Sequence, residues 1–176
     1  MPAPGPTTLV DAVDDRNEPV AVVPRGEVFS RHANFRTVHV LVFNSRGEVL
    51  LQRLSAQRER HPGRWGSSVA GYLHAGEEYE QAARRRLLEE LGLTTELRPI
   101  GVLAMADDGV TKFVGVFVTA ADQPRNVLPD HIAALQFRPV EEVRDQLAWH
   151  PDDYTDTLRE VFAFLEKADD DLVRRR

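Results

Sequence analysis

The chain has 176 residues, the size of one domain that buries its own apolar core. Its formal net charge of -6 at pH 7 argues against a nucleic-acid partner, because proteins that bind nucleic-acid backbones usually present a basic surface. The absence of cysteine excludes disulfides, thiolate metal sites and cysteine nucleophiles, and no apolar run reaches the length of a membrane span.

The first half of the chain has the pattern of β-strands. Residues 9–13 and 19–23 are short apolar runs around the polar stretch "DDRNE", which predicts a hairpin. Two β-rich runs in "TVHVLVFNSRGEVLLQR" are separated by the turn "NSRG", which predicts a central hairpin. Residues 54–66 are polar and contain "HPG", so we expect a surface loop there, followed by a short strand at 67–70.

The second half alternates helical and β patterns. Apolar residues at four-residue spacing predict a helix over 78–91, with a glycine just beyond its end. Strands are expected at 97–105, 112–119 and 135–138, and "PVEEVRDQL" and "DDYTDTLREVFAFLEK" predict two closing helices.

These elements predict a fold of the α/β or α+β class, with a mixed β-sheet packed between helices. We expect one domain over residues 9–167, flanked by flexible tails at 1–8 and 168–176. Because the N-terminus has no signal-peptide pattern, we expect a cytoplasmic protein without a membrane partner.

Two carboxylates stand side by side on the predicted helix over 78–91. Glu89 and Glu90 project away from the leucine face of that helix. The loop before the helix begins at Ala70, and Gly71 and Gly76 allow a ligand to approach its backbone closely. Magnesium commonly binds one or two carboxylates together with substrate phosphates and water. Adjacent glutamates alone more often form a solvated helix face, so the wider pattern decides between the two readings.

The wider pattern is "GYLHAGEEYEQAARRRLLEELGL", residues 71–93. It matches eight of the nine defined positions of G-x5-E-x7-R-E-U-x-E-E-x-G-U, where U is a bulky apolar residue, and so resembles the Nudix box. The resemblance implies a Nudix-type α/β/α sandwich in which Glu77 and Arg85 orient the box. It also implies that Glu89 and Glu90, with Ala70 beside them, bind Mg2+ or Mn2+ at a catalytic centre.

One box position departs from the family pattern, because Arg86 stands where the pattern has glutamate. Replacing a negative by a positive charge about 6 Å from a dication weakens the interaction by roughly 10 kcal/mol at an effective dielectric of about 20. Arg86 therefore turns away, pairs with Glu90, or contacts substrate phosphates directly. His74, Arg53 and Arg64 are the other candidates for an anion-binding pocket.

The resemblance covers residues 10–167 and is greatest to the Nudix branch that includes isopentenyl diphosphate isomerase. His32 and His39 are spaced like two metal-binding histidines of those isomerases. However, Ala70 stands where the isomerase cysteine falls, and Tyr72 stands where its third metal-binding histidine falls. These differences leave the isomerase reading as the weakest of three.

The leading hypothesis is a Nudix-type hydrolase that cleaves a nucleoside diphosphate or another diphosphate-linked small molecule by metal-assisted attack of water. The first alternative is a Nudix-like protein that binds a phosphorylated ligand through Arg86 without turning it over. The second is an isoprenoid diphosphate isomerase. A homodimer is compatible with all three hypotheses.

Overall fold

The computed structural model describes residues 5–168. Residues 1–4 and 169–176, which make up most of the two predicted tails, lie outside the described residues. The strands are β1 Leu9–Val13, β2 Pro19–Pro24, β3 Phe35–Phe43, β4 Val49–Leu54, β5 Trp65–Gly66, β6 Val69–Tyr72, β7 Arg98–Asp107, β8 Val110–Ala120 and β9 Ile132–Arg138. The α-helices are α1 Tyr79–Leu91, α2 Val140–Trp149 and α3 Asp156–Ala168.

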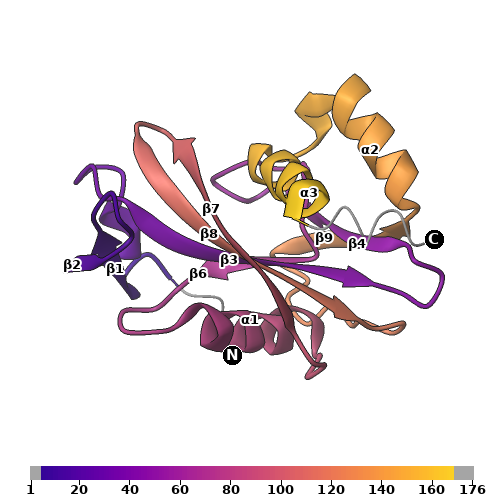
Figure 1. Cartoon of the computed structure of the whole chain (residues 1–176), viewed down its shortest axis with the longest axis horizontal. Coiled ribbons are helices and arrows are strands. Elements are labelled where there is room, and N and C mark those ends of the chain that lie inside the picture. The colour runs from indigo at the N-terminus through magenta and orange to yellow at the C-terminus, as the bar shows by residue number, and fades with distance from the viewer. Residues whose placement is uncertain (1–4, 169–176) are drawn as a thin grey trace.

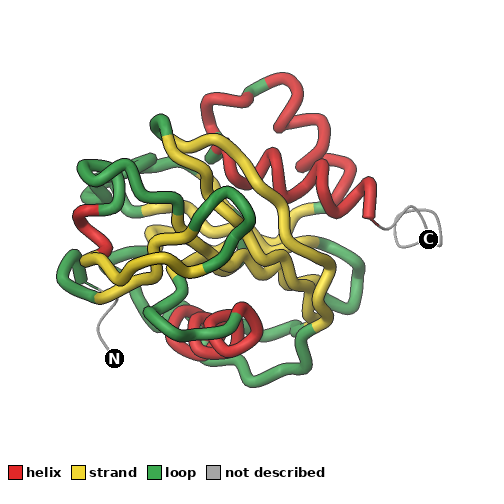
Figure 2. The backbone as a smooth tube through the Cα atoms, turned by 60° about the vertical axis from the view of Figure 1, so that its left-hand side comes forward, coloured by secondary structure: helices red, strands yellow, loops and turns green. Residues whose placement is uncertain are grey.

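The molecule is a sheet covered by helices on both faces, as the sequence predicted (Figures 1 and 2). Helix α1 lies on one face, where its buried Leu87 and Leu91 pack with Val38 and Val40 of β3. Helices α2 and α3 lie on the other face, and α3 packs beside Leu41 of the same strand. Because alternate residues of a strand point to opposite faces, β3 contributes to both apolar layers. None of the helices within residues 5–168 is long and apolar enough to cross a membrane.

The main sheet is mixed, because β3 pairs with β8 in parallel while the other pairings are antiparallel. The hairpin strands β3 and β4 share a single register pair, Phe43 with Val49. Beyond that pair the two strands follow different partners: β3 pairs with β6 and β8, and β4 pairs with β5 and β9. The sheet therefore divides into two branches.

Both ends of α1 are fixed by local sequence. At its start, the Glu78 backbone N–H donates to the Gln81 side chain at 2.9 Å. At its end, Gly92 adopts a left-handed conformation with φ 65°, which glycine tolerates better than other residues. These ends fix the helix that carries the Nudix-box glutamates.

Candidate functional site

Arg85 and Glu77 connect helix α1 to the loop that precedes it. Arg85 Nε and Nη2 donate to the two oxygens of the Glu77 carboxylate at 2.8 and 2.9 Å. Arg85 Nη2 also donates to the Tyr72 carbonyl at 3.0 Å, and Glu77 accepts the His74 backbone N–H at 2.8 Å. This bidentate pair holds the loop against the helix in one geometry.

Arg86 lies between the two glutamates that follow it on α1. Its Nη1 donates to Glu89 and its Nη2 donates to Glu90, each at 2.8 Å. Arg86 and Glu90 are only 5% and 2% exposed, so the guanidinium neutralises a buried carboxylate. A Cβ on Gly71 would lie 2.5 Å from Arg86 Nε, so glycine is required there to leave room for the Arg86 side chain. Of the three possibilities for Arg86, the structure therefore shows pairing.

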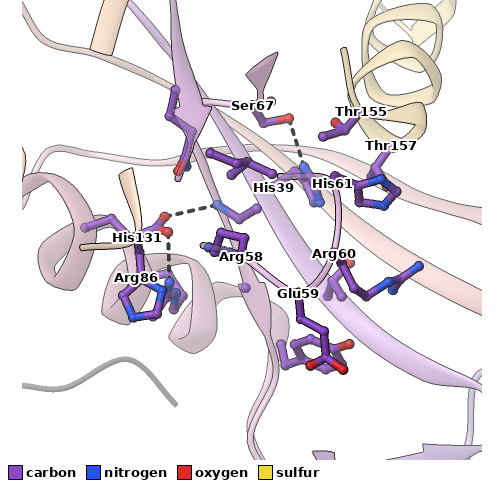
Figure 3. A pocket seen from close by; sticks show the side chains of 18 of the residues that line it. His39, Arg58, Glu59, Arg60, His61, Ser67, Arg86, His131, Thr155 and Thr157 are labelled. Carbon is purple, nitrogen blue, oxygen red and sulfur yellow. Dashed lines mark hydrogen bonds and ion pairs between the residues drawn. The ribbon is translucent and has the colours of Figure 1, made fainter. Parts of the chain in front are cut away.

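A cavity of about 510 Å³ opens where the two branches of the sheet separate. The lining includes residues of β3 and β6 from one branch and of β4 and β5 from the other. Helix α1 contributes Arg86 and Glu90, and the loop over 55–64 contributes five consecutive residues from Gln57 to His61. Figure 3 shows part of this lining. The cavity brings together segments that are far apart in the sequence.

The Arg86 end of the cavity carries two arginines, whose charge is partly offset by Glu90 and Asp130 in the lining. Arg58 lines the cavity beside Arg86, and within residues 5–168 its guanidinium forms no hydrogen bond or ion pair (Figure 3). Burial lowers the pKa of Arg58, while the nearby Glu90 carboxylate opposes that change. Burial and the charges of Arg58 and Arg86 lower the pKa of His131 below its usual value. We call Arg58, Arg86 and His131 the cationic end.

Another cation, Lys112, is buried in the wall of the cavity. Its Nζ contacts Asp107 at 3.0 Å and donates to the Thr157 hydroxyl at 2.6 Å. Burial lowers the Lys112 pKa, and the Asp107 carboxylate opposes that effect. Burial, together with the Lys112 charge, lowers the pKa of His39 to about 3. His39 is therefore neutral at physiological pH and shares a 2.8 Å hydrogen bond between its Nδ1 and the Ser67 hydroxyl.

The structure separates the predicted site residues into two groups. Ala70, Arg86 and Glu90 line the cavity, whereas the remaining predicted residues do not: Arg53, Arg64, His74, Glu77, Arg85 and Glu89. Arg53 is exposed and its Nε donates to the Gly63 carbonyl at 3.1 Å.

The two histidines of the isomerase comparison lie in different environments. His32 is exposed on a turn with φ 51° and does not line the cavity. His39 is buried in the cavity wall.

The residues present do not fit a divalent metal held by the protein alone. Among residues 5–168, no group of three or more His, Asp or Glu side chains is placed to hold a metal ion. Arg86 pairs with both Glu89 and Glu90. The oxygens that a dication would need therefore already face a positive charge, which repels the dication. Only Glu90 of this pair lines the cavity, and its second oxygen accepts the Ala70 backbone N–H at 3.1 Å.

The layered fold, the box loop and α1 together define a Nudix-type domain. The family model for the NUDIX domain matches residues 33–160, and the chain belongs to this family. The family is generally hydrolytic, and its enzymes generally use divalent metals.

Similar proteins are named either as Nudix hydrolases or as isopentenyl-diphosphate Delta-isomerases. An uncharacterized Nudix hydrolase of Pseudomonas aeruginosa is 34% identical over 149 residues, covering 82% of this chain and 88% of the relative. An isopentenyl-diphosphate Delta-isomerase of Nocardia farcinica is 33% identical over 166 residues, covering 90% and 95%. The crystal structure of DR0079 from Deinococcus radiodurans superposes with a TM-score of 0.76 at 25% identity, covering 87% of this chain and 96% of that one.

Proposed function

We propose that the protein is a Nudix hydrolase that binds a small-molecule diphosphate in the cavity and cleaves its phosphoanhydride bond with water. The observation that carries this proposal is the unpaired guanidinium of Arg58, which lies in the cavity wall beside Arg86. Arg58 is half-buried, so its free N–H donors can reach a ligand in the cavity, and a guanidinium matches the oxygens of a phosphate. The diphosphate would therefore lie between Arg58 and Arg86.

Each residue of the cationic end has a separate role in this proposal. Arg58 supplies free donors to the diphosphate. Burial raises the pKa of Glu90, Arg86 opposes that change, and the remaining face of its guanidinium is presented to the ligand. The Arg86 Nε has no hydrogen-bond partner within the described part of the chain and is buried against Gly71. Burial and the charges of the two arginines lower the pKa of His131, and a bound diphosphate would offset those charges and raise that pKa.

Magnesium or manganese enters this proposal with the ligand, as a metal–diphosphate complex. Both oxygens of Glu90, the box carboxylate on the cavity wall, are already paired, so the phosphate oxygens and water would hold the cation. Such a cation would offset the charge that develops on the phosphate oxygens during cleavage. Arg58 and Arg86 orient the diphosphate, and the β3 and β4 branches enclose it.

A second candidate function is binding of a phosphorylated ligand without turnover. The specific observation in its favour is that Arg86 occupies both Glu89 and Glu90. Isomerisation of an isoprenoid diphosphate has less support, because Ala70 and Tyr72 line the cavity where the resemblance places a cysteine and a histidine.

The test is product detection by mass spectrometry with nucleotide, nucleotide-sugar and isoprenoid diphosphates, with and without Mg2+ or Mn2+. The proposal predicts cleavage that needs the metal and falls at least about tenfold in Glu90→Gln, since the neutral amide no longer forms the ion pair that positions Arg86 beside the ligand. The matched control is Glu80→Gln, which changes an exposed carboxylate of the same helix. Binding without cleavage in every case would instead support the second candidate.

A further inference from the structure

The wall of the cavity contributed by the sheet contains polar groups that no protein atom satisfies. Among the described residues, four buried side-chain atoms lack a hydrogen-bond partner. Three of them belong to residues that line the cavity: Thr37 Oγ1, Gln52 Oε1 and Arg86 Nε. Arg86 was assigned to the diphosphate above. Thr37 and Gln52 are 6% and 2% exposed and have no such assignment.

The orientation of the Gln52 amide is fixed by its neighbour. Gln52 Nε2 donates to the Ser68 carbonyl at 3.0 Å, and because a carbonyl can only accept, the nitrogen must face Ser68. The unpaired atom is therefore the amide oxygen, which requires an N–H or O–H donor. The Thr37 hydroxyl can donate or accept.

The neighbours His39 and Ser67 are polar and uncharged, and the Lys112 charge, which also lies in the cavity lining, lowers the pKa of His39. His39 is neutral and its Nδ1 shares a hydrogen bond with the Ser67 hydroxyl, and both residues line the cavity. In Figure 3, His39 and Ser67 lie away from Arg86 and His131, with Arg58 between the two groups. We call Thr37, His39, Gln52 and Ser67 the polar wall.

We infer that the polar wall is a subsite for the organic portion of the ligand, and that this portion carries hydroxyl or N–H groups. The inference rests on the proposed diphosphate site, because the cationic end fixes where the organic portion begins. A hydrocarbon chain against this wall would leave Thr37 and Gln52 unsatisfied, whereas a sugar hydroxyl or a base N–H would pair with them. A site built to hydrogen-bond a ligand group discriminates strongly against an analogue that lacks the group. Thr37 and Gln52 thus select polar ligands over prenyl diphosphates.

The test compares three probes by isothermal titration calorimetry: inorganic pyrophosphate, uridine diphosphate and dimethylallyl diphosphate. Uridine diphosphate should bind about tenfold more tightly than pyrophosphate, and dimethylallyl diphosphate should show no such gain. In Thr37→Val the ratio of affinities for uridine diphosphate and pyrophosphate should fall about fivefold, and Thr37→Ser should restore it, because serine keeps the hydroxyl. Valine replaces an unpaired hydroxyl by a methyl group, so the free variant should unfold at the same or a higher temperature.

An unchanged ratio of affinities in Thr37→Val would overturn the inference, because the Thr37 hydroxyl would then pair with water and not with the ligand. An equal gain for dimethylallyl diphosphate would overturn it as well. If pyrophosphate and both organic diphosphates fail to bind, the proposed function itself is refuted. Binding of pyrophosphate with no gain for uridine diphosphate refutes only the polar wall.

Discussion

Replacement of Arg86 by methionine tests whether its guanidinium neutralises the buried carboxylate of Glu90. The substitution keeps most of the side-chain length and removes the ion pairs to Glu89 and Glu90. Glu90 is 2% exposed, and its remaining partner is the Ala70 backbone N–H. Leaving a buried charge without its partner typically costs about 3–5 kcal/mol of unfolding free energy. For an m-value of about 2 kcal/mol/M, this loss shifts the urea midpoint by roughly 2 M.

The loss should depend on pH in a defined direction. Burial raises the pKa of Glu90 although the Arg86 charge opposes it, so removing Arg86 raises that pKa further. A carboxyl group whose folded pKa is raised stabilises the fold fully below its unfolded pKa, and that contribution is lost as pH rises through the folded pKa. Arg86→Met should therefore be more destabilised at pH 8 than at pH 5.

Urea unfolding at pH 5 and pH 8, followed by circular dichroism, measures this difference. The matched control is Arg84→Met on the same helix, because among residues 5–168 Arg84 pairs only with the exposed Glu80 and such pairs contribute about 0–1 kcal/mol. The reasoning is refuted if Arg86→Met loses the same stability at both pH values, or loses no more than the control.

Two further predictions concern the walls of the cavity. The His39 imidazole should stay neutral from pH 5 to 8 in NMR titrations, because burial and Lys112 hold its pKa at about 3, and a titration midpoint near 6.5 would contradict this. Gly71→Ala should destabilise the protein by about 1–3 kcal/mol in urea unfolding, because its Cβ would lie 2.5 Å from Arg86 Nε. The control Gly66→Ala adds a Cβ at an ordinary 3.6 Å contact, and an equal effect of the two substitutions would argue against a special fit at Gly71.

The elements could be predicted from the sequence because their signals are local. The four-residue spacing that includes Leu87 and Leu91 marked α1, and the turn "NSRG" marked the β3–β4 hairpin. Strand β5, Trp65–Gly66, was missed because two residues show no periodicity. Its position depends on pairing with β4, which is a tertiary contact.

The candidate site could be predicted only where its residues belong to the box. Arg86 and Glu90 were found through the spacing of the box, and both line the cavity. Arg58 and Lys112 were not singled out as ligand-binding residues, because they lie in different segments and neither belongs to a motif. They meet because the sheet divides after the Phe43–Val49 pair, and a sequence pattern does not reveal that division. The run "QRERH", residues 57–61, was the one available signal for Arg58, since charged residues concentrated in a loop often contact ligands.

The most direct test of the diphosphate site is calorimetric titration of inorganic pyrophosphate into the protein and into Arg58→Met, with and without Mg2+. Because the Arg58 guanidinium has no hydrogen-bond partner within residues 5–168, its removal should leave the unfolding temperature unchanged. It should weaken pyrophosphate binding by at least about tenfold, as loss of a hydrogen bond to a charged group does. The control Arg53→Met, outside the cavity, should bind like the unmodified protein. Equal affinities of Arg58→Met and Arg53→Met would contradict a diphosphate site at this end of the cavity.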